Sequence, residues 1–397
     1  MRDASEVAPQ VSAGDWTIGM VAGEASGDTL AALLIAALRV RLPQVRFVGV
    51  AGPKMEAAGC EVWAPLEMLS IRGFAEVLSR VPELWRFRRS LARRMRKAKI
   101  AMFIGVDAPD FNLGLERKLK RRGIRTVHFV SPSVWAWRRE RIQTIGRSVH
   151  RLLALFPFEP ALYEAAGVPV TYVGHPLAHD AATDTTRRLA REQLRIPLAQ
   201  PVFALLPGSR RSELEMHGDM LLKTAAAIHA QKPDARFLVP FATRPTRDRF
   251  ETDLFRLKLD GLPITLLYGH ARDALQAADV ALVASGTATL EAALARCPHA
   301  IFYRVKALTE WYVRRKFLLP YVGLPNVLAG KFVVPEFLQD EATVENLTQA
   351  AVNLYDDTVT RRRLESIFAD FAASLDVDTA NVAADAIVDE LSRARRR

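Results

Sequence analysis

Apolar runs rich in β-branched residues alternate along the chain with stretches whose apolar positions recur at helical spacing. This alternation is typical of βα units built around parallel sheets, so the pattern predicts two successive α/β domains. Each predicted strand is followed by a turn marked by glycine or proline. The first series of predicted strands comprises residues 17–22, 46–50, 100–105, 126–130 and 152–156, and the second comprises 202–206, 236–240, 264–267, 280–284 and 300–303.

The boundary between the two predicted domains lies between Gly174 and Pro201. The polar segment at 179–195, rich in Thr, Asp and Arg, is either a linker or the first helix of the second domain. The predicted parts are a disordered extension at 1–15, an N-terminal domain at 16–178, a C-terminal domain at 179–365, and helices at 366–397 that pack back on the N-terminal domain or on a partner subunit.

Length and cysteine content narrow the class of protein. A chain of 397 residues fits two or three domains. The longest apolar run, residues 30–38, is too short for a membrane-spanning helix, and the first fifteen residues lack the apolar core of a secretory signal. Cys60 and Cys297 cannot form a disulfide framework, so we expect a reducing cytoplasm.

Three short loops each follow a predicted strand and precede a helix, the position at which open α/β sheets bind ligands. In the first loop, Gly23 and Gly27 allow a tight turn that presents Glu24, Ser26 or Asp28, before a helix expected at 29–39. The spacing is not the G-x-G-x-x-G fingerprint, so a dinucleotide site is not favoured. A purely structural turn fits this loop equally well.

The second loop contains Gly208, Ser209 and Arg210 just before a predicted helix. Free backbone N–H groups at a helix N-terminus, together with a guanidinium, suit a diphosphate. In the alternative interpretation, Ser209 or Ser212 caps the helix and Arg210 is solvated.

The third loop repeats this arrangement with Ser285, Gly286 and Thr287. Glu291 follows one turn inside the next helix, where its carboxylate is able to accept hydrogen bonds from sugar hydroxyls. A capping box, in which Glu291 satisfies the backbone, is equally compatible with the spacing.

Two carboxylates, Asp107 and Asp110, follow a predicted buried strand and are candidates for a general base, although Asp before Ala-Pro is also a common turn opener. Trp135 and Trp137, in another loop after a strand, either line a sugar or acyl site or pack between domains. A metal site is not expected, because no cysteine pair or H-E-x-x-H motif supplies ligands.

Charge is concentrated in one segment. The chain carries 55 Lys and Arg against 44 Asp and Glu, a net charge of +11 that suggests an anionic partner. Residues 80–99 hold nine basic residues against Glu83 alone, a net charge of +8.

Apolar residues at helical spacing run through the same region, and Pro82 is predicted to restart the helix. The combination is typical of a helix lying at a membrane surface, or of a helix packed on the sheet with its charges in water. The predicted membrane contacts are Ile71, Phe74, Leu78, Val81, Trp85, Arg88 and Arg89.

Read in order, the loops resemble the lipid-A-disaccharide synthases, a family of inverting glycosyltransferases of the GT-B architecture. The resemblance runs from about residue 17 to 347. It implies two Rossmann-like parallel-sheet domains facing across a cleft. The segments that carry it are 22–28, 49–55, 105–112, 131–138, 173–177, 206–213, 284–291 and 324–330.

The resemblance also implies a reaction. UDP-2,3-diacylglucosamine and 2,3-diacylglucosamine 1-phosphate (lipid X) give a β-1,6-linked disaccharide 1-phosphate and UDP, with no cofactor or metal. We expect such an enzyme to act as a peripheral protein on the cytoplasmic face of the inner membrane, against an anionic lipid surface, and a homodimer is possible by analogy with the family.

By the same resemblance, Asp107 is the expected base, with Glu24 and Asp110 in reserve, and Arg210 stabilises the leaving diphosphate. Glu291 is the candidate for the ribose, and Asn326 matches a family position for substrate. The expected substrate-binding residues are Gly208, Ser209, Ser285, Gly286, Thr287, Glu291, Asn326 and Ser26.

Two alternatives remain open from the sequence. One is a GT-B enzyme that transfers N-acetylglucosamine to a peptidoglycan lipid precursor; Leu324-Pro325-Asn326 and residues 105–112 favour the lipid A enzyme. The other is a basic nucleic-acid-binding α/β protein. Nucleic acid is not the expected partner, because polar and stacking residues would then surround the charges instead of Ile, Leu and Val.

Overall fold

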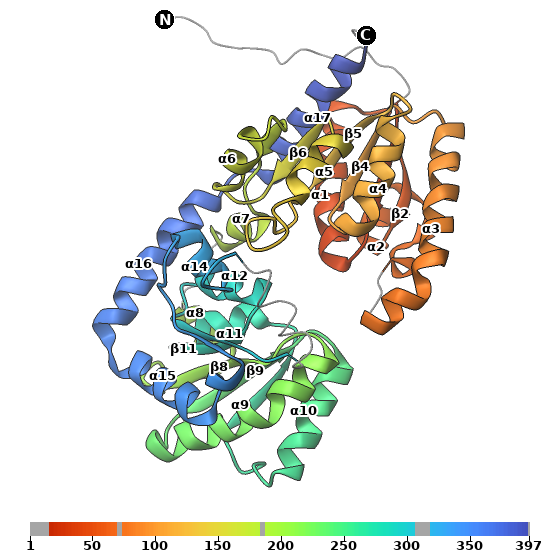
Figure 1. Ribbon diagram of the computed structural model, residues 1–397. Helices are drawn as coiled ribbons and strands as arrows, with labels where there is room; N and C mark the ends of the chain where they lie inside the picture. The colour runs from red at the N-terminus through yellow and green to blue at the C-terminus, as the bar shows by residue number, and fades with distance from the viewer. Residues whose placement is uncertain (1–15, 70–73, 183–186, 306–317, 396–397) are drawn as a thin grey trace, which may run out of the picture. The chain divides into compact units, whose positions relative to one another are not determined.

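The computed structural model describes residues 16–69, 74–182, 187–305 and 318–395 (Figure 1). The chain divides into two compact units. Unit 1 comprises Met1–Pro176 and Val377–Arg397, and unit 2 comprises Leu177–Asp376. The chain thus leaves unit 1, builds unit 2 and returns. The segment expected to form a separate group of helices from residue 366 onward is divided between the units at Asp376.

Unit 1 is built on a seven-stranded parallel sheet in the order β3-β2-β1-β4-β5-β6-β7. From β1 the chain adds β2 and β3 on one side of the sheet, and from β4 it adds β5, β6 and β7 on the other side. The direction in which strands are added therefore reverses between β1 and β4. Its strands are β1 (Thr17–Ala22), β2 (Arg46–Ala51), β3 (Cys60–Pro65), β4 (Met102–Val106), β5 (Arg125–Phe129), β6 (Arg151–Ala154) and β7 (Val170–Tyr172).

The helices of unit 1 cover both faces of this sheet, which explains why β4 is a continuous apolar run with every residue buried. They are α1 (Ala25–Arg41), α2 (Pro53–Ala57), η1 (Leu66–Met68), α3 (Phe74–Lys97), α4 (Pro109–Lys120), α5 (Arg141–Ser148), α6 (Glu159–Glu164) and α17 (Thr379–Arg395).

Unit 2 repeats the plan with a six-stranded parallel sheet in the order β10-β9-β8-β11-β12-β13, which reverses between β8 and β11. Its strands are β8 (Val202–Leu206), β9 (Arg236–Phe241), β10 (Ile264–Tyr268), β11 (Val280–Ala284), β12 (His299–Tyr303) and β13 (Glu336–Leu338). Its helices are α7 (Pro176–Ala182), α8 (Arg187–Gln193), α9 (Arg211–Gln231), α10 (Arg244–Arg256), α11 (Ala271–Ala277), α12 (Thr287–Leu294), α14 (Leu324–Ala329), η2 (Gln339–Glu341), α15 (Val344–Asp356) and α16 (Thr358–Leu375).

The two parallel sheets confirm the predicted α/β class, and the ten predicted strands coincide with ten of the thirteen strands found in the described residues. Sequence pattern missed β3, β7 and β13, which form sheet edges and are only partly buried. The prediction that Pro82 restarts the basic helix is wrong, since α3 runs through Pro82 without a break.

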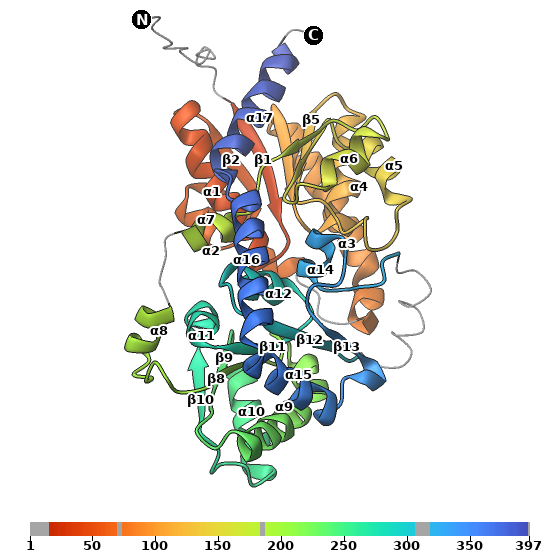
Figure 2. The same cartoon turned by 90° about the vertical axis from the view of Figure 1, so that its left-hand side faces the viewer.

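The last helix completes unit 1. In Figures 1 and 2 the blue helix α17 lies beside the red and yellow elements of this unit, and it packs on α1 and β5. Ala383 and Ile387 join the core under β1. Buried Glu390 accepts hydrogen bonds from Arg125 of β5 at 3.4 Å and Arg151 of β6 at 3.1 Å. The sheet of unit 1 is therefore held together from both ends of the chain.

Among the helices that the structure describes, none is both long and apolar enough to cross a membrane.

Candidate functional site

Parallel α/β sheets bind ligands beyond the carboxyl ends of their strands, at the point where the strand order reverses. In unit 1 that point lies between β1 and β4, which lead into the loops containing Glu24 and Asp107. In unit 2 it lies between β8 and β11, which lead into the loops containing Gly208 and Gly286. The four loops that the sequence marks as candidates therefore form two pairs, one at the switch point of each sheet.

In unit 1 the two loops touch. A Cβ atom at Gly23 would lie 2.4 Å from the Cβ atom of Ala108, so only glycine permits this approach. The Asn112 amide, fully buried in α4, donates to the carbonyl of Val21 at 3.2 Å and to that of Asp107 at 2.8 Å. Asn112 was not singled out from the sequence as a functional residue. It ties the carboxyl end of β1 to that of β4.

The turn after β4 has an unusual backbone. Asp107 and Ala108 both adopt left-handed conformations, with φ of 54° and 43°. Residues other than glycine, Asn and Asp rarely occupy this region, and such strain concentrates at functional sites. The Asp107 backbone N–H donates to Phe129 at 2.8 Å, which anchors the turn to β5. The turn therefore holds Asp107 in a fixed, half-buried position at the switch point.

The carboxylates near this turn differ in their partners. Within the described ranges, no side chain forms a hydrogen bond or an ion pair with the carboxylate of Asp107 or of Glu24. The carboxylate of Asp110, one of the reserve candidates, is paired with Arg141. Ser26 lies exposed in the first turn of α1. Among the described residues, the carboxylates of Asp107 and Glu24 thus differ from that of Asp110 in having no side-chain partner.

The expected start of the first helix at residue 29 is wrong. The helix begins at Ala25, so Asp28 lies inside its first turn and is buried. Its carboxylate accepts backbone N–H groups from Gly52 at 2.9 Å, Lys54 at 3.0 Å and Met55 at 3.1 Å. Asp28 thus satisfies the free N–H groups of α2, a helix that the apolar pattern did not reveal.

In unit 2, the loop after β8 is closed by Glu213 of α9. Its carboxylate accepts the backbone N–H groups of Ser209 at 2.8 Å and Arg210 at 3.1 Å. Gly208, with φ of 112°, leaves room for this, because a Cβ atom there would lie 2.4 Å from Glu213 Oε2. The expectation that these N–H groups are free for an anion is therefore wrong for this structure, and neither Ser209 nor Ser212 caps the helix.

The cation of this loop remains accessible. Arg210 lies 3.2 Å from Glu213 Oε1, yet its side chain is 69% exposed. Tyr303, at the end of β12, donates to the same Glu213 oxygen at 3.4 Å. Glu213 and Tyr303 were not recognised from the sequence; an acidic residue three positions into a helix is the signal that could have revealed the first.

The loop after β11 presents Ser285, Gly286 and Thr287 at the start of α12. Gly286 has φ of 149°, and both Gly286 and Thr287 are exposed. Ser285 donates its backbone N–H to Phe302 at 3.0 Å. Glu291, one turn further, is partly buried, and burial raises the pKa of its carboxyl above the usual value. No hydrogen-bond partner of this carboxyl lies in the part of unit 2 that the structure describes, so it is poised for a ligand.

A buried histidine braces the first of these loops. His217 Nδ1 of α9 lies 2.9 Å from the Pro207 carbonyl oxygen, and its Nε2 lies 3.1 Å from the Arg304 backbone nitrogen and 3.3 Å from the Arg304 carbonyl oxygen. A neutral ring with its proton on Nδ1 donates to Pro207 and accepts from the Arg304 N–H. Burial lowers the pKa of His217, which favours the same neutral form. His217 therefore joins the β8 loop to the segment after β12.

The His217 brace predicts a pH effect on stability. Because the pKa in the folded state lies below the ordinary value of 6.5, the unfolded chain takes up the proton more readily, and the free energy of unfolding falls as pH drops below about 6.5. His217→Gln keeps both hydrogen bonds but cannot titrate. We expect this variant to lose less stability than the native protein on acidification, as measured by urea unfolding at pH 7.5 and 5.5. Equal acid sensitivity of the two proteins would contradict the assignment.

Asn326 uses all of its hydrogen-bonding capacity within unit 2. Its amide donates to Val334 at 3.0 Å and Glu336 at 2.7 Å, and its oxygen accepts backbone N–H groups from Val333 at 2.7 Å and Val334 at 3.0 Å. The side chain is fully buried. In this arrangement Asn326 shapes the segment between α14 and β13 and has no group left for a ligand.

The tryptophan loop after β5 is held by protein contacts. Trp135 donates to Glu159 at 3.3 Å and packs edge-on against Phe158 at 5.7 Å. Glu159 is buried, and burial raises the pKa of its carboxyl to about 7. Trp137 lies under Arg138, 4.4 Å from the guanidinium. Both indoles therefore have partners inside unit 1.

Helix α3 has two different halves. Its C-terminal half is part of the core, with Leu91 and Met95 buried against β1 and β2. In its N-terminal half Val81 and Trp85 are each 50% exposed, one turn apart, and Arg89 stacks on the Trp85 ring at 4.4 Å. Ile71 lies outside the described residues, as do the side chains of Phe74 and Leu78.

Arg88 faces inward instead of joining this exposed stripe. Its guanidinium is half-buried, donates to the carbonyls of Asp110 and Phe111 at 3.4 Å, and lies 5.8 Å from the Phe111 ring. A Cβ atom at Gly114 would lie 2.0 Å from Arg88 Nη1, so α4 carries glycine at the contact. Arg88 thus joins α3 to the first turn of α4, immediately after Asp107.

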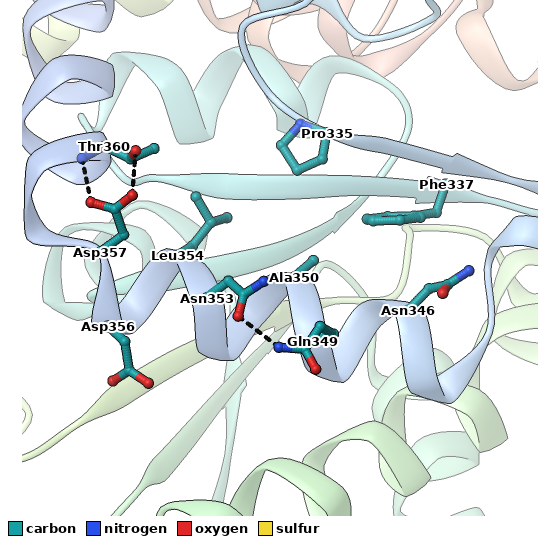
Figure 3. A pocket seen from close by; sticks show the side chains of 10 residues that line it. All are labelled: Pro335, Phe337, Asn346, Gln349, Ala350, Asn353, Leu354, Asp356, Asp357 and Thr360. Carbon is teal, nitrogen blue, oxygen red and sulfur yellow. Dashed lines mark hydrogen bonds between the residues drawn. The ribbon is translucent and has the colours of Figure 1, made fainter.

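One hollow of unit 2 lies away from the switch-point loops. A shallow cavity of about 760 Å³ is bordered by α15, β13 and the start of α16 (Figure 3). Asp356 and Asp357 line it, and Asp357 accepts from the backbone and hydroxyl of Thr360. Its charged lining is acidic and it contains none of the switch-point loops, so it is unsuited to a diphosphate. Within the described ranges, no three His, Cys, Asp or Glu side chains are grouped so as to hold a metal ion.

The geometry supports a division of chemistry. Unit 1 offers an unpaired carboxylate on a rigid turn, suited to accept a proton from a hydroxyl group. Unit 2 offers an exposed guanidinium, glycine-lined loops and an unpartnered carboxyl, suited to a phosphorylated, hydroxyl-rich ligand such as a nucleotide.

Comparison with known proteins points in the same direction. The family model described as lipid-A-disaccharide synthetase matches residues 18–387. The lipid-A-disaccharide synthase of Dechloromonas aromatica is 52% identical over 376 residues, which cover 94% of this chain and 98% of that protein.

Among solved structures, a putative UDP-N-acetylglucosamine 2-epimerase from Listeria monocytogenes has a TM-score of 0.61 at 14% identity, covering 94% of this chain and 95% of its own. Acinetobacter baumannii MurG has a TM-score of 0.58 at 16% identity, covering 95% of this chain and all of its own. These likenesses concern the fold.

Proposed function

Because this chain belongs to the lipid-A-disaccharide synthase family, it is a hexosyltransferase of lipopolysaccharide biosynthesis, and we propose that the two switch points described above divide its reaction between them. The enzyme joins UDP-2,3-diacylglucosamine to 2,3-diacylglucosamine 1-phosphate and releases UDP. The observation that carries this function is the family match over residues 18–387. It does not favour the peptidoglycan-lipid transferase or the nucleic-acid-binding protein.

In the proposed mechanism, Asp107 acts in unit 1. Its carboxylate takes the proton of the acceptor 6-hydroxyl as the hydroxyl oxygen attacks the anomeric carbon, and the bond from that carbon to the UDP oxygen breaks with its electron pair on UDP. An inverting displacement needs a base of this kind on the face opposite the leaving group. Among the described residues Asp107 has no side-chain partner, whereas Asp110 is paired with Arg141, and this difference supports the choice.

Unit 2 holds the donor in this proposal. Arg210 compensates the charge that develops on the leaving diphosphate, and the glycine-containing loops at Gly208 and Gly286 allow the nucleotide to approach the backbone closely. The carboxyl of Glu291, which has no hydrogen-bond partner among the described residues, accepts the ribose hydroxyls. We assign Asn326 to shaping the segment that follows α14, because its hydrogen bonds are all internal.

The test of this function is a coupled assay of UDP release. Purified protein should release UDP only when both acylated substrates are present. Turnover of unacylated UDP-N-acetylglucosamine with a peptidoglycan lipid would contradict the assignment. So would UDP release that does not require lipid X.

We also propose that α3 is the contact with an anionic membrane surface on the cytoplasmic face of the inner membrane. Val81 and Trp85 give it an exposed apolar stripe, and arginines flank that stripe. Helix α4 adds to the charge: the pKa of Lys118 is lowered by desolvation and then by the nearby Arg89 and Arg93. An apolar stripe beside concentrated positive charge suits the interface of anionic lipid bilayers, where each Lys or Arg contributes about 1 kcal/mol.

This proposal predicts a defect in vesicle binding. Replacing both Val81 and Trp85 by Ser removes the apolar stripe, and we expect binding to vesicles containing anionic phospholipid to weaken about tenfold or more, since burial of such side chains is worth about 1.5–3 kcal/mol each. The measurement is co-sedimentation at several salt concentrations. Val40→Ser is the matched control, because Val40 is 81% exposed on α1 of the same unit. Unchanged binding of the double variant would reject α3 as the contact.

A further inference from the structure

A buried ion pair lies beneath the Asp107 turn. Glu116 of α4 and His128 of β5 are both fully buried, and Glu116 Oε1 lies 2.7 Å from His128 Nδ1. Neither residue belongs to a loop or to any motif described above. The pair is the only described contact between an acidic and a basic side chain in which both are completely inaccessible to solvent.

Glu116, His128 and Asn112 all lie beside the backbone of Gly105. His128 is the register neighbour of Gly105 in the sheet. A Cβ atom at Gly105 would lie 2.2 Å from Glu116 Oε1 and 2.9 Å from the Asn112 Cβ atom. Gly105 lies two residues before Asp107, and Asn112 donates to the Asp107 carbonyl at 2.8 Å. The three side chains therefore pack directly against the backbone that carries Asp107.

This cluster is incompletely satisfied. Glu116 Oε2, His128 Nε2 and Asn112 Oδ1 are buried without a hydrogen-bond partner in the described part of the chain. Leaving a polar group buried and unpartnered is unfavourable, because the group loses its hydrogen bonds to water. A buried ion pair seldom stabilises a fold more than apolar residues of the same volume, so stability does not explain why this one is present.

Both members of the pair have perturbed protonation. Burial raises the pKa of Glu116, although His128 opposes this. Burial lowers the pKa of His128, but Glu116 and, more weakly, Asp107 reverse the direction, so the net shift is upward. The imidazolium that Glu116 stabilises thus lies within electrostatic reach of Asp107. Coupled, perturbed groups of this kind cluster at functional sites.

We propose that Glu116 and His128 are positioning residues for Asp107: their hydrogen bond locks α4 onto β5 under Gly105 and so fixes the left-handed turn that aims the Asp107 carboxylate. This inference rests on the proposed role of Asp107 as the base. It assigns the pair an effect on the chemical step and none on the binding of UDP, which belongs to unit 2.

The main test compares kcat and KM of three variants. Glu116→Gln keeps an oxygen that accepts from His128 Nδ1–H, and we expect its kcat to remain within about threefold of the native value. Glu116→Ala removes the hydrogen bond, and we expect kcat to fall about tenfold to 100-fold, the loss typical of a misplacement of about 1 Å, with KM for the UDP-sugar unchanged. Glu164→Ala is the control, because Glu164 is an exposed carboxylate on α6 of the same unit, and we expect this variant to keep the native kcat and KM.

A double replacement guards against simple unfolding. Glu116→Met combined with His128→Leu removes the pair and its unpartnered atoms together, so we expect thermal stability equal to or above that of the native protein while kcat still falls about tenfold or more. Full activity in this folded variant, or in folded Glu116→Ala, would overturn the proposal.

A double-mutant cycle separates this inference from the proposed base. If the pair acts through Asp107, Glu116→Ala should cost nothing further in kcat when added to Asp107→Asn. Additive losses would show that the pair acts independently of Asp107 and would overturn the inference. Full activity of Asp107→Asn alone would reject the base itself, whatever the behaviour of Glu116.

Discussion

Asp107→Asn should lower kcat by about 10²-fold to 10⁴-fold, the usual contribution of a positioned general base, and leave the Kd for UDP unchanged. The amide cannot take the proton of the attacking hydroxyl. Asn tolerates the left-handed backbone at position 107, where φ is 54°, nearly as well as Asp does, so the turn should keep its shape. The loss should therefore appear in the chemical step alone.

The measurement is UDP release under saturating concentrations of both acylated substrates, with UDP affinity followed by calorimetry. Glu164→Gln is a suitable control, because Glu164 is an exposed carboxylate on α6 of the same unit. Native turnover by Asp107→Asn would exclude this base and direct attention to Glu24, whose carboxylate is the other unpartnered one at the switch point.

The second large effect is expected at Arg210. Removing one charged donor from a developing oxyanion typically costs about 3 kcal/mol, so Arg210→Ala should lower kcat by about 10²-fold to 10³-fold. UDP binding should weaken as well, since the product diphosphate carries the same charge. Glu213 should still hold the loop through the backbone N–H groups of Ser209 and Arg210, which the substitution leaves in place.

The next residue provides the matched control. Arg211 has a 77% exposed side chain paired with Glu215, one turn along α9, so Arg211→Ala removes the same charge from nearly the same place. The two variants should fold equally well and differ at least tenfold in activity. Equal activities would mean that net charge near the loop matters and a directed contact from Arg210 does not.

The sequence pattern predicted strand boundaries best for strands that helices cover on both faces of the sheet. β1, β8 and β11 were predicted with their observed ends, because strands covered by helices on both faces are continuous apolar runs. The edge strands β3, β7 and β13 interleave polar residues with apolar ones and escaped notice. Helix ends were less predictable, since α1 starts without a side-chain cap at Glu24.

For the candidate site, the sequence identified the loops but not the contacts inside them. Strand order brings the loops of Glu24 and Asp107 together, and strand order depends on pairings that no local pattern encodes. The same limit hid Glu213, which occupies the N–H groups expected to be free, and the pair of Glu116 and His128, whose members lie on different elements. Likewise Arg88 belongs to the basic run by sequence, and only the packing of α3 on α4 turns it inward.

The return of the chain to unit 1 has a consequence for the order in which the protein folds. Unit 2 is continuous in sequence and has all of its core residues once α16 has been synthesised. Unit 1 lacks Ala383 and Ile387, and the partner of Arg125 and Arg151, until the end of the chain emerges. Domains generally fold as units during synthesis. Unit 2 therefore completes its core first, and unit 1, although most of it is synthesised earlier, completes its core last.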